Sequence, residues 1–141
     1  MPDSAQLHDL ALPTLWLDLW NGDYALADRI VATPFILHAA LPDGSDTSAI
    51  DRPEAVADWV RQIRVGVRDL HYSIEAGPVI DGNLIAVRWR ATGHLAARTG
   101  AMGAPIDFTG MDMLRLEGGR IVEYWLNSDV HVLLAQMQSA N

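Results

Sequence analysis

The sequence contains no cysteine, few basic side chains and no long apolar run. Without cysteine the chain has no disulfides, thiolate metal ligands or cysteine nucleophiles, which is compatible with a reducing cytoplasm. Ten Lys and Arg against 18 Asp and Glu give a net charge of −8, which opposes binding to phosphate backbones. No basic segment precedes an apolar core at the N-terminus, and nowhere do about 18 apolar residues follow one another. We therefore expect a cytoplasmic protein that binds neither nucleic acid nor membrane.

Hydrophobic residues, in contrast, are plentiful. They make up 50% of the 141 residues, which is enough for a core with a modest cavity in a chain of this length. We find no internal repeat, low-complexity tract or linker. The sequence therefore predicts one domain over residues 1–141.

The clearest structural pattern lies in the last third of the chain. Two runs of strand-forming residues, 106–116 and 120–127, flank Gly118-Gly119, and this arrangement predicts a β-hairpin. Asn127-Ser128-Asp129 then offers helix-capping side chains ahead of an apolar stripe at helical spacing. The chain is therefore predicted to end as strand, strand, helix.

Helices are predicted to gather ahead of the sheet. Pro13 is expected either to kink the first predicted helix or to begin a second one. Residues Asp51 to Glu54 predict a capping-box start for the helix that precedes the long strands. A polar segment, 41–50, is predicted to be a mobile loop or lid. The predicted helices are 4–21, 24–31 and 51–65, and the predicted extended segments are 35–39, 70–76 and 79–95, the last with a turn at 81–83. This order predicts an α+β fold whose antiparallel sheet curls over the helices.

Asp112 is the acid whose position is most unusual. It shares a strand face with Gly110 and Leu114, whereas Asp107 is out of phase and should face solvent. A carboxylate in a mostly apolar row must be hydrogen-bonded, shifted towards neutrality, or directed at a cavity. Asp112 is thus a candidate general acid or base. The alternative is a structural pairing across the sheet with Arg88, Arg90 or another cation.

Several short motifs, in this order and spacing, resemble the SnoaL-like polyketide cyclase family. They are Trp20-Asn21-Gly22-Asp23, His38 after Phe35, the run 112–115 leading into 117–125, and Asp129 with Gln136. This family belongs to the nuclear transport factor 2-like and ketosteroid isomerase-like superfamily. The resemblance implies a cone: a strongly curved antiparallel sheet around about three helices, a short C-terminal helix and an apolar pocket. Leu126 stands where many members have an acid.

The candidate site combines this acid with nearby titratable and aromatic side chains. Asp129, His38 and His94 could assist Asp112, although Asp129 is also suited to cap a helix and either histidine could be structural. We expect neither a metal nor another cofactor, because histidines and acids lack ligand spacing and the glycines fit no phosphate loop. The predicted pocket residues are Trp16, Trp20, Trp59, Trp89, Phe108, Tyr124 and Leu126.

Three functions fit these residues. The first is a cofactor-independent enzyme, a cyclase, isomerase or dehydratase, that moves protons on a small hydrophobic polyketide, terpenoid or steroid-like substrate. The second is a non-catalytic module that binds a small molecule. The third is an epoxide hydrolase-like site with Asp112, Asp129 and Arg88. We also expect a homodimer through the outer face of the sheet, formed by Arg88, Arg90, Met111, Met113 and Arg115.

Overall fold

The computed structural model describes residues 4–41, 44–96 and 102–139. Three helical segments, one strand and a further helix come first, and four long strands then follow one another ahead of a last helix. The elements are α1 Ser4–Trp20, η1 Tyr24–Leu26, α2 Ala27–Ile30, β1 Val31–His38, α3 Pro53–Val65, β2 Val67–Asp81, β3 Leu84–Ala96, β4 Met102–Glu117, β5 Arg120–Ser128 and α4 Val130–Ser139. The predicted α+β class is therefore confirmed.

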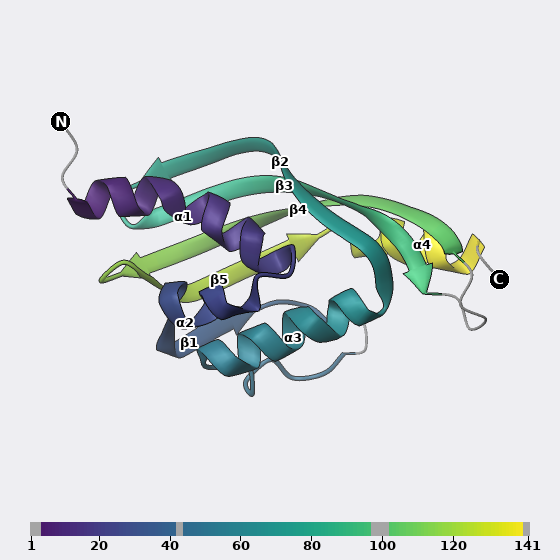
Figure 1. The fold of residues 1–141 in the computed structure, drawn as a ribbon, viewed down its shortest axis with the longest axis horizontal. Coiled ribbons are helices and arrows are strands. Elements are labelled where there is room, and N and C mark those ends of the chain that lie inside the picture. The colour runs from purple at the N-terminus through teal and green to yellow at the C-terminus, as the bar shows by residue number, and fades with distance from the viewer. Residues whose placement is uncertain (1–3, 42–43, 97–101, 140–141) are drawn as a thin grey trace.

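The five strands form one open, mixed sheet in the order β1-β5-β4-β3-β2. Strand β1 runs parallel to β5, and the other neighbours are antiparallel. The helices α1, α2 and α3 lie on one side of the curved sheet, and α4 lies at the far end beside β4 (Figure 1). This arrangement is the cone expected from the resemblance, with one parallel strand pair that the sequence did not predict.

The core lies between the sheet and the helices. Helix α1 contributes Leu12, Trp16 and Leu19, and α3 contributes Val56 and Val60, all of them without exposed surface. The strands meet them with alternate residues, because successive side chains of a strand point to opposite faces. The inward row of β3 and β4 includes Ile85, Val87, Trp89, Ala91, Asp112, Leu114 and Leu116, all buried. None of the helices in the described part of the chain is long and apolar enough to cross a membrane.

Two predictions about helix starts differ from the structure. A single helix, α1, runs through Pro13, so the proline does not begin a second one. Helix α3 starts at Pro53 with Arg52 at its N-cap and without a side-chain capping bond. The predicted capping box is wrong because the carboxylate of Asp51 instead accepts a hydrogen bond from the Arg52 guanidinium at 2.9 Å.

The first long hairpin also differs in its limits. The sequence predicted a break between residues 76 and 79, but β2 continues to Asp81 and turns at Gly82-Asn83. The pairing of β2 with β3 is irregular around Ala76, so the strand continues through the predicted break. Gly77 has a φ of +89°, which favours glycine at this position. The small and Gly-rich residues of 96–104 predict a loop or a bulged crossing. Residues 97–101 of this segment lie outside the described residues, and β4 already starts at Met102.

Side-chain amides complete two strand edges of the open sheet. Asn21, just after α1, accepts a hydrogen bond from the backbone N–H of Tyr72 at 2.7 Å and donates to its carbonyl at 3.0 Å. Gln136 of α4 makes the same reciprocal pair with Asp107, at 2.9 and 2.8 Å. Each amide therefore takes the place of one residue of a neighbouring strand. The first of these pairs fixes Tyr72 beside the end of α1.

Candidate active site

Asp112 lies at the centre of the concave side of the sheet. Its carboxylate accepts hydrogen bonds from Trp16 Nε1 at 3.0 Å, Trp89 Nε1 at 2.9 Å and the Tyr124 hydroxyl at 2.9 Å. These donors come from α1, β3 and β5, and the acid comes from β4. A carboxylate offers about four acceptor positions, and the three donors use both of those on Oδ1 and one on Oδ2. One position on Oδ2 is therefore left for a ligand.

The environment of Asp112 makes it a weak acid that titrates near neutrality. Burial raises its pKa to about 6, although the hydrogen bonds from Trp16, Trp89 and Tyr124 each act in the opposite direction. The side chain is almost fully buried, with 4% of its surface exposed. A carboxyl group with such a pKa exchanges its proton readily at physiological pH, as acid/base catalysis requires.

A cavity of about 640 Å³ opens next to this carboxyl group. Its inner wall is aromatic, and its outer part carries polar side chains from the loop after β1 and from α3. The lining residues that the sequence analysis did not single out for the pocket include Leu17, Ala40, Leu41, Ser45, Asp46, Ile50, Arg52, Asp58, Gln62, Ile63, Tyr72, Ser128, Val130 and Leu133. The volume is in the range of pockets that hold drug-sized ligands.

The structure places most of the predicted pocket residues in this wall. Trp20, Trp59, Trp89, Phe108, Tyr124 and Leu126 line the cavity. Trp16 does not line it: its ring lies behind Asp112, 4.9 Å from the Tyr124 ring centroid and edge-on to it. Trp16 thus orients the acid from the core side, whereas the other six residues shape the space in front of it.

The two candidate histidines lie elsewhere. His38 Nε2 is 2.7 Å from Glu123 Oε2 and its ring is stacked on Trp125, 5.2 Å between centroids, on the outer side of the sheet. His94 alternates with the inward residue Gly93 and is therefore directed away from the cavity. Neither histidine lines the cavity with Asp112. The geometry gives no support to a role for them beside this acid.

Asp129 is also separate from the cavity wall. Its carboxylate accepts a hydrogen bond from Thr109 Oγ1, which in turn accepts one from Arg88 at 2.9 Å. The backbone carbonyl of Asp129 accepts the first amides of α4, from Val132 and Leu133. Asp129 therefore connects the start of α4 to the outer face of β4.

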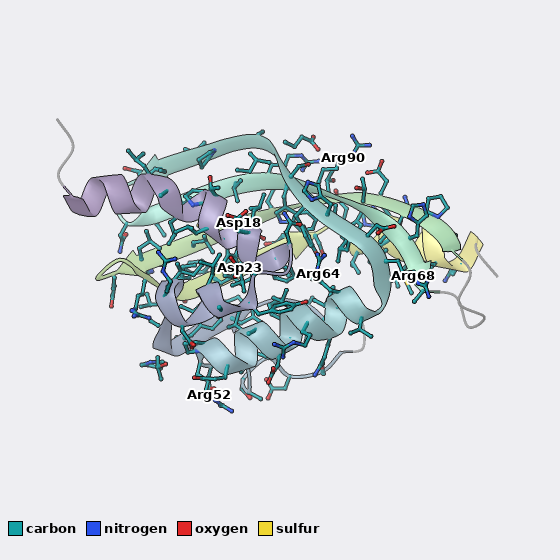
Figure 2. The ribbon with its side chains drawn as sticks, in the orientation of Figure 1. Asp18, Asp23, Arg52, Arg64, Arg68 and Arg90 are labelled. Carbon is teal, nitrogen blue, oxygen red and sulfur yellow. The ribbon has the colours of Figure 1, made fainter. Side chains whose placement is uncertain are left out.

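The cations suggested as structural partners of Asp112 are engaged with other acids. Arg88 pairs with Glu75 at 3.3 Å. Arg90 pairs with the exposed Asp107, and Arg90 lies on the side of the sheet that faces away from α3 (Figure 2). The alternative of an ion pair between Asp112 and either arginine is therefore wrong. The epoxide hydrolase-like trio fails for the same reason, because Arg88 and Asp129 meet on the outer face while Asp112 points inward.

Tyr72 is the residue that the sequence reasoning missed. It lines the cavity with 7% of its surface exposed, and its ring contacts Trp20 and Trp89, each at 5.3 Å between centroids. It alternates with the buried Leu70 and therefore points inward, but nothing in the sequence separates a pocket tyrosine from a core tyrosine. Among the described residues, no group of three or more histidines and acids is arranged to hold a metal ion.

Comparison with known proteins agrees with this fold. The family model of the SnoaL-like domain matches residues 14–124, which is most of the chain. The curved sheet, the helices on its concave side and the cavity between them define the ketosteroid isomerase-like class of α+β cones. Within that class, the protein belongs to the SnoaL-like family. No curated protein matches the sequence.

Solved structures show the same architecture along nearly the whole chain. IdmH from Streptomyces antibioticus, a candidate polyketide cyclase, is 25% identical with a TM-score of 0.72 and covers 93% of this chain and 98% of its own. TsrD from Streptomyces laurentii is 18% identical, with a TM-score of 0.74 and coverages of 97% and 98%. A protein of ketosteroid isomerase-like fold from Catenulispora acidiphila is 20% identical, with a TM-score of 0.70 and coverages of 87% and 88%.

Proposed function

We propose that this protein is a cofactor-independent enzyme that transfers protons on a small hydrophobic substrate held in the cavity. The reaction would be a cyclisation, isomerisation or dehydration, and the substrate a polyketide, terpenoid or steroid-like carbonyl compound. The observation that carries the proposal is the position of Asp112: a nearly buried acid, held by three donors, that lines a large cavity. Membership of a family with polyketide cyclase neighbours supports the same class of chemistry.

Asp112 would act as the base in this reaction. Its pKa of about 6 leaves mostly carboxylate at pH 7, and the open position on Oδ2 can accept a proton from the substrate. The three donors hold the carboxylate in one orientation, so that little reorganisation is required during the reaction. The aromatic wall excludes water from the substrate carbon and favours an apolar ligand.

The test is Asp112→Asn, with Asp107→Asn as a matched control on the same strand. We expect the Asp112 variant to lose about 100-fold or more of the proton-transfer rate on a panel of cyclic ketones, within the range of general acid–base catalysis. Asp107 is exposed and paired with Arg90, so its variant should keep the wild-type rate. Circular dichroism would verify that both fold. An unchanged rate in Asp112→Asn would remove this acid from the mechanism.

A non-catalytic binding module is the second candidate function. The observation in its favour is that three intramolecular donors already satisfy most of the Asp112 carboxylate, as a purely structural acid would require. Native mass spectrometry of the protein with the same ketones, together with deuterium exchange of the ketone protons, distinguishes the two functions. Binding without enhanced exchange in the wild type would favour the module.

A further inference from the structure

The charged side chains in the cavity wall are mostly acids. Among the described residues that line the cavity, they are Asp46, Arg52, Asp58 and Asp112. Asp112 is buried at the inner end, whereas the other three are exposed and therefore lie at the mouth. A cleft lined by one sign of charge attracts ligands of the opposite sign. The balance of charge at the mouth therefore decides which ligands the cavity favours.

Arg52 does not balance the acids of the mouth. Its Nη1 donates a hydrogen bond to Asp51 Oδ1 at 2.9 Å, and its Nε lies 4.0 Å from Glu54 Oε2. Neither of these two acids belongs to the described cavity wall. The positive charge of Arg52 is thus compensated by acids outside the cavity, and little of it is left for an anionic ligand.

Asp46 keeps its negative charge without a cation beside it. Its carboxylate oxygens accept hydrogen bonds from the backbone N–H of Ser48 at 2.9 Å and from the Ser48 hydroxyl at 2.8 Å. These bonds, the one from the backbone most strongly, lower the pKa of Asp46 below its ordinary value. No ion pair joins Asp46 to a cation of the described part of the chain. Asp46 is therefore a fixed negative charge of the loop after β1.

Asp58 brings a second carboxylate to the mouth from α3. Its Oδ1 accepts a hydrogen bond from Arg61 at 2.7 Å, and the Arg61 guanidinium also lies over the ring of Tyr24 at 4.6 Å. Neither Arg61 nor Tyr24 lines the cavity. The cation therefore approaches Asp58 from outside the cavity. The other oxygen, Oδ2, makes no hydrogen bond to the described residues and is available to a ligand.

The residue that follows Asp58 places an aromatic ring at the same end of the cavity. Trp59 is half-buried, lines the cavity and meets the Trp20 ring edge-on at 5.1 Å between centroids. Tryptophan faces attract cations, and carboxylates form charge-assisted hydrogen bonds with protonated amines. Acids and an indole in one wall are therefore a combination that suits an ammonium group.

A buried donor in this wall independently indicates that the cavity is built for a ligand. The indole N–H of Trp20 makes no hydrogen bond within the described part of the chain, and 6% of the Trp20 surface is exposed. Buried polar groups without partners are rare and require an explanation. A ligand with polar as well as apolar parts supplies one.

We propose that the cavity takes ligands with an apolar body and a protonated or quaternary amine, which Asp46 and Asp58 select by binding the amine at the mouth. This inference rests on the proposed function and narrows its substrate class to hydrophobic carbonyl compounds that carry a basic amino group. The apolar body lies against the aromatic inner wall, and Asp112 stays free for proton transfer. Ligands that end in a carboxylate or a phosphate meet the same two acids and are repelled.

The experiment compares two probes of the same shape and different charge. They are trimethyl(2-naphthylmethyl)ammonium and its neutral isostere 2-(2,2-dimethylpropyl)naphthalene, in which a carbon replaces the charged nitrogen. Equilibrium dialysis gives the Kd of each probe for wild type, Asp46→Asn, Asp58→Asn and the double variant. Asp81→Asn is the matched control, because Asp81 is an exposed acid at the end of β2 and lies outside the cavity wall. It removes the same charge from the chain at a distant place.

We expect wild type to bind the cation about tenfold or more tightly than the isostere, from the carboxylates and the indole together. The double variant should reduce this ratio to about threefold or less, each single variant should give an intermediate ratio, and Asp81→Asn should keep the wild-type ratio. The Kd of the neutral isostere should be the same in all five proteins, which verifies that the cavity is intact. Salt should reduce the preference of wild type more than that of the double variant.

Two results would overturn the proposal. The first is a wild type that binds both probes equally, and the second is a double variant that keeps the wild-type ratio, which would place the cation elsewhere in the cavity. In both cases the rate assay of Asp112→Asn still decides the proposed function. If the cation preference depends on Asp46 and Asp58 but wild type does not accelerate exchange of the ketone protons, the selection at the mouth stands and the proposed function fails.

Discussion

The indole nitrogen of Trp16 lies 3.0 Å from Oδ2 of Asp112 and connects the first helix to the fourth strand. This contact joins residues 96 positions apart in the sequence. Because Trp16 has no exposed surface, water cannot replace its N–H if the side chain is lost. The orientation of the acid therefore depends on how α1 packs against the sheet.

Trp16→Phe should lower the stability of the protein and raise the pKa of Asp112. Loss of the buried indole and of a hydrogen bond to a carboxylate should lower the free energy of unfolding by about 2–3 kcal/mol. The Asp112 pKa should rise further above about 6, because one of the bonds that lowers it is gone. Urea denaturation and ¹³C NMR of the carboxyl group measure these effects. Trp125→Phe, on the outer face against His38, should change the Asp112 pKa little.

The burial of Asp112 should make the protein less stable as pH rises through the range of its titration. Its pKa is raised from 3.8 to about 6, so the folded state holds the proton more tightly than the unfolded state. The contribution of Asp112 to the free energy of unfolding is fully present below about pH 4 and is lost by about pH 6 to 7. The change is about 3 kcal/mol.

The difference in unfolding free energy between wild type and Asp112→Asn, measured from pH 4 to 8, isolates this contribution. The lowered pKa values of Asp107 and Glu123 act with the opposite sign, but they are present in both proteins and cancel. The difference should fall as pH rises. A difference that stays constant across this range would mean that the Asp112 pKa is ordinary.

Gly110→Ala should disturb the site through Trp89. A Cβ at position 110 would lie only 2.2 Å from Cζ2 of Trp89, so the indole must move and its bond to Asp112 must lengthen or break. We expect a loss of about 1–3 kcal/mol in unfolding free energy, as overpacked cores show. Tryptophan fluorescence and the proton-transfer assay report the displacement. Gly66→Ala is the control, because its new Cβ would meet only ordinary contacts and its φ is −80°.

The outer face of the sheet should bind a second copy of the chain. Met111 and Met113 are 49% and 42% exposed there. The charged groups around them form pairs, Arg88 with Glu75, Arg90 with Asp107 and Arg115 with Glu123, so little net charge surrounds the two methionines although the chain carries −8. Two such faces can approach without net repulsion.

Sedimentation equilibrium should therefore give a dimer for wild type and a monomer for the double variant Met111→Asp, Met113→Asp. The matched variant Val65→Asp, at the exposed end of α3, should remain dimeric. A monomeric wild type at micromolar concentration would contradict this surface assignment.

The closing hairpin and the inward position of Asp112 could be predicted from the sequence. Turn glycines and strict alternation specify strands locally, and the family motifs supplied the order of the remaining elements. The partners of Asp112 could not be predicted, because the Trp16 and Trp89 bonds depend on how distant elements pack. The sequence suggested arginines instead, and those point to the opposite face.

His38 and His94 were grouped with Asp112 because an imidazole can transfer protons near neutral pH. Their positions in the alternation of β1 and β3 direct both side chains to the outer side of the sheet. Strand phase was predictable for His94, since it alternates with Gly93. The parallel pairing of β1 with β5 was not, because β1 is separated from β5 by most of the chain.

The two hydrogen bonds between the Gln136 side chain and the Asp107 backbone affect whether β4 can pair with strands of other molecules. The ladder between β4 and β5 ends at Gly110, so the first half of β4 would otherwise offer backbone groups to any extended segment nearby. The Gln136 amide of α4 occupies the backbone N–H and carbonyl of Asp107, so these groups cannot pair with a strand of another molecule. Removal of this last helix would expose the backbone groups of Asp107 and would also take Val130 and Leu133 out of the cavity wall.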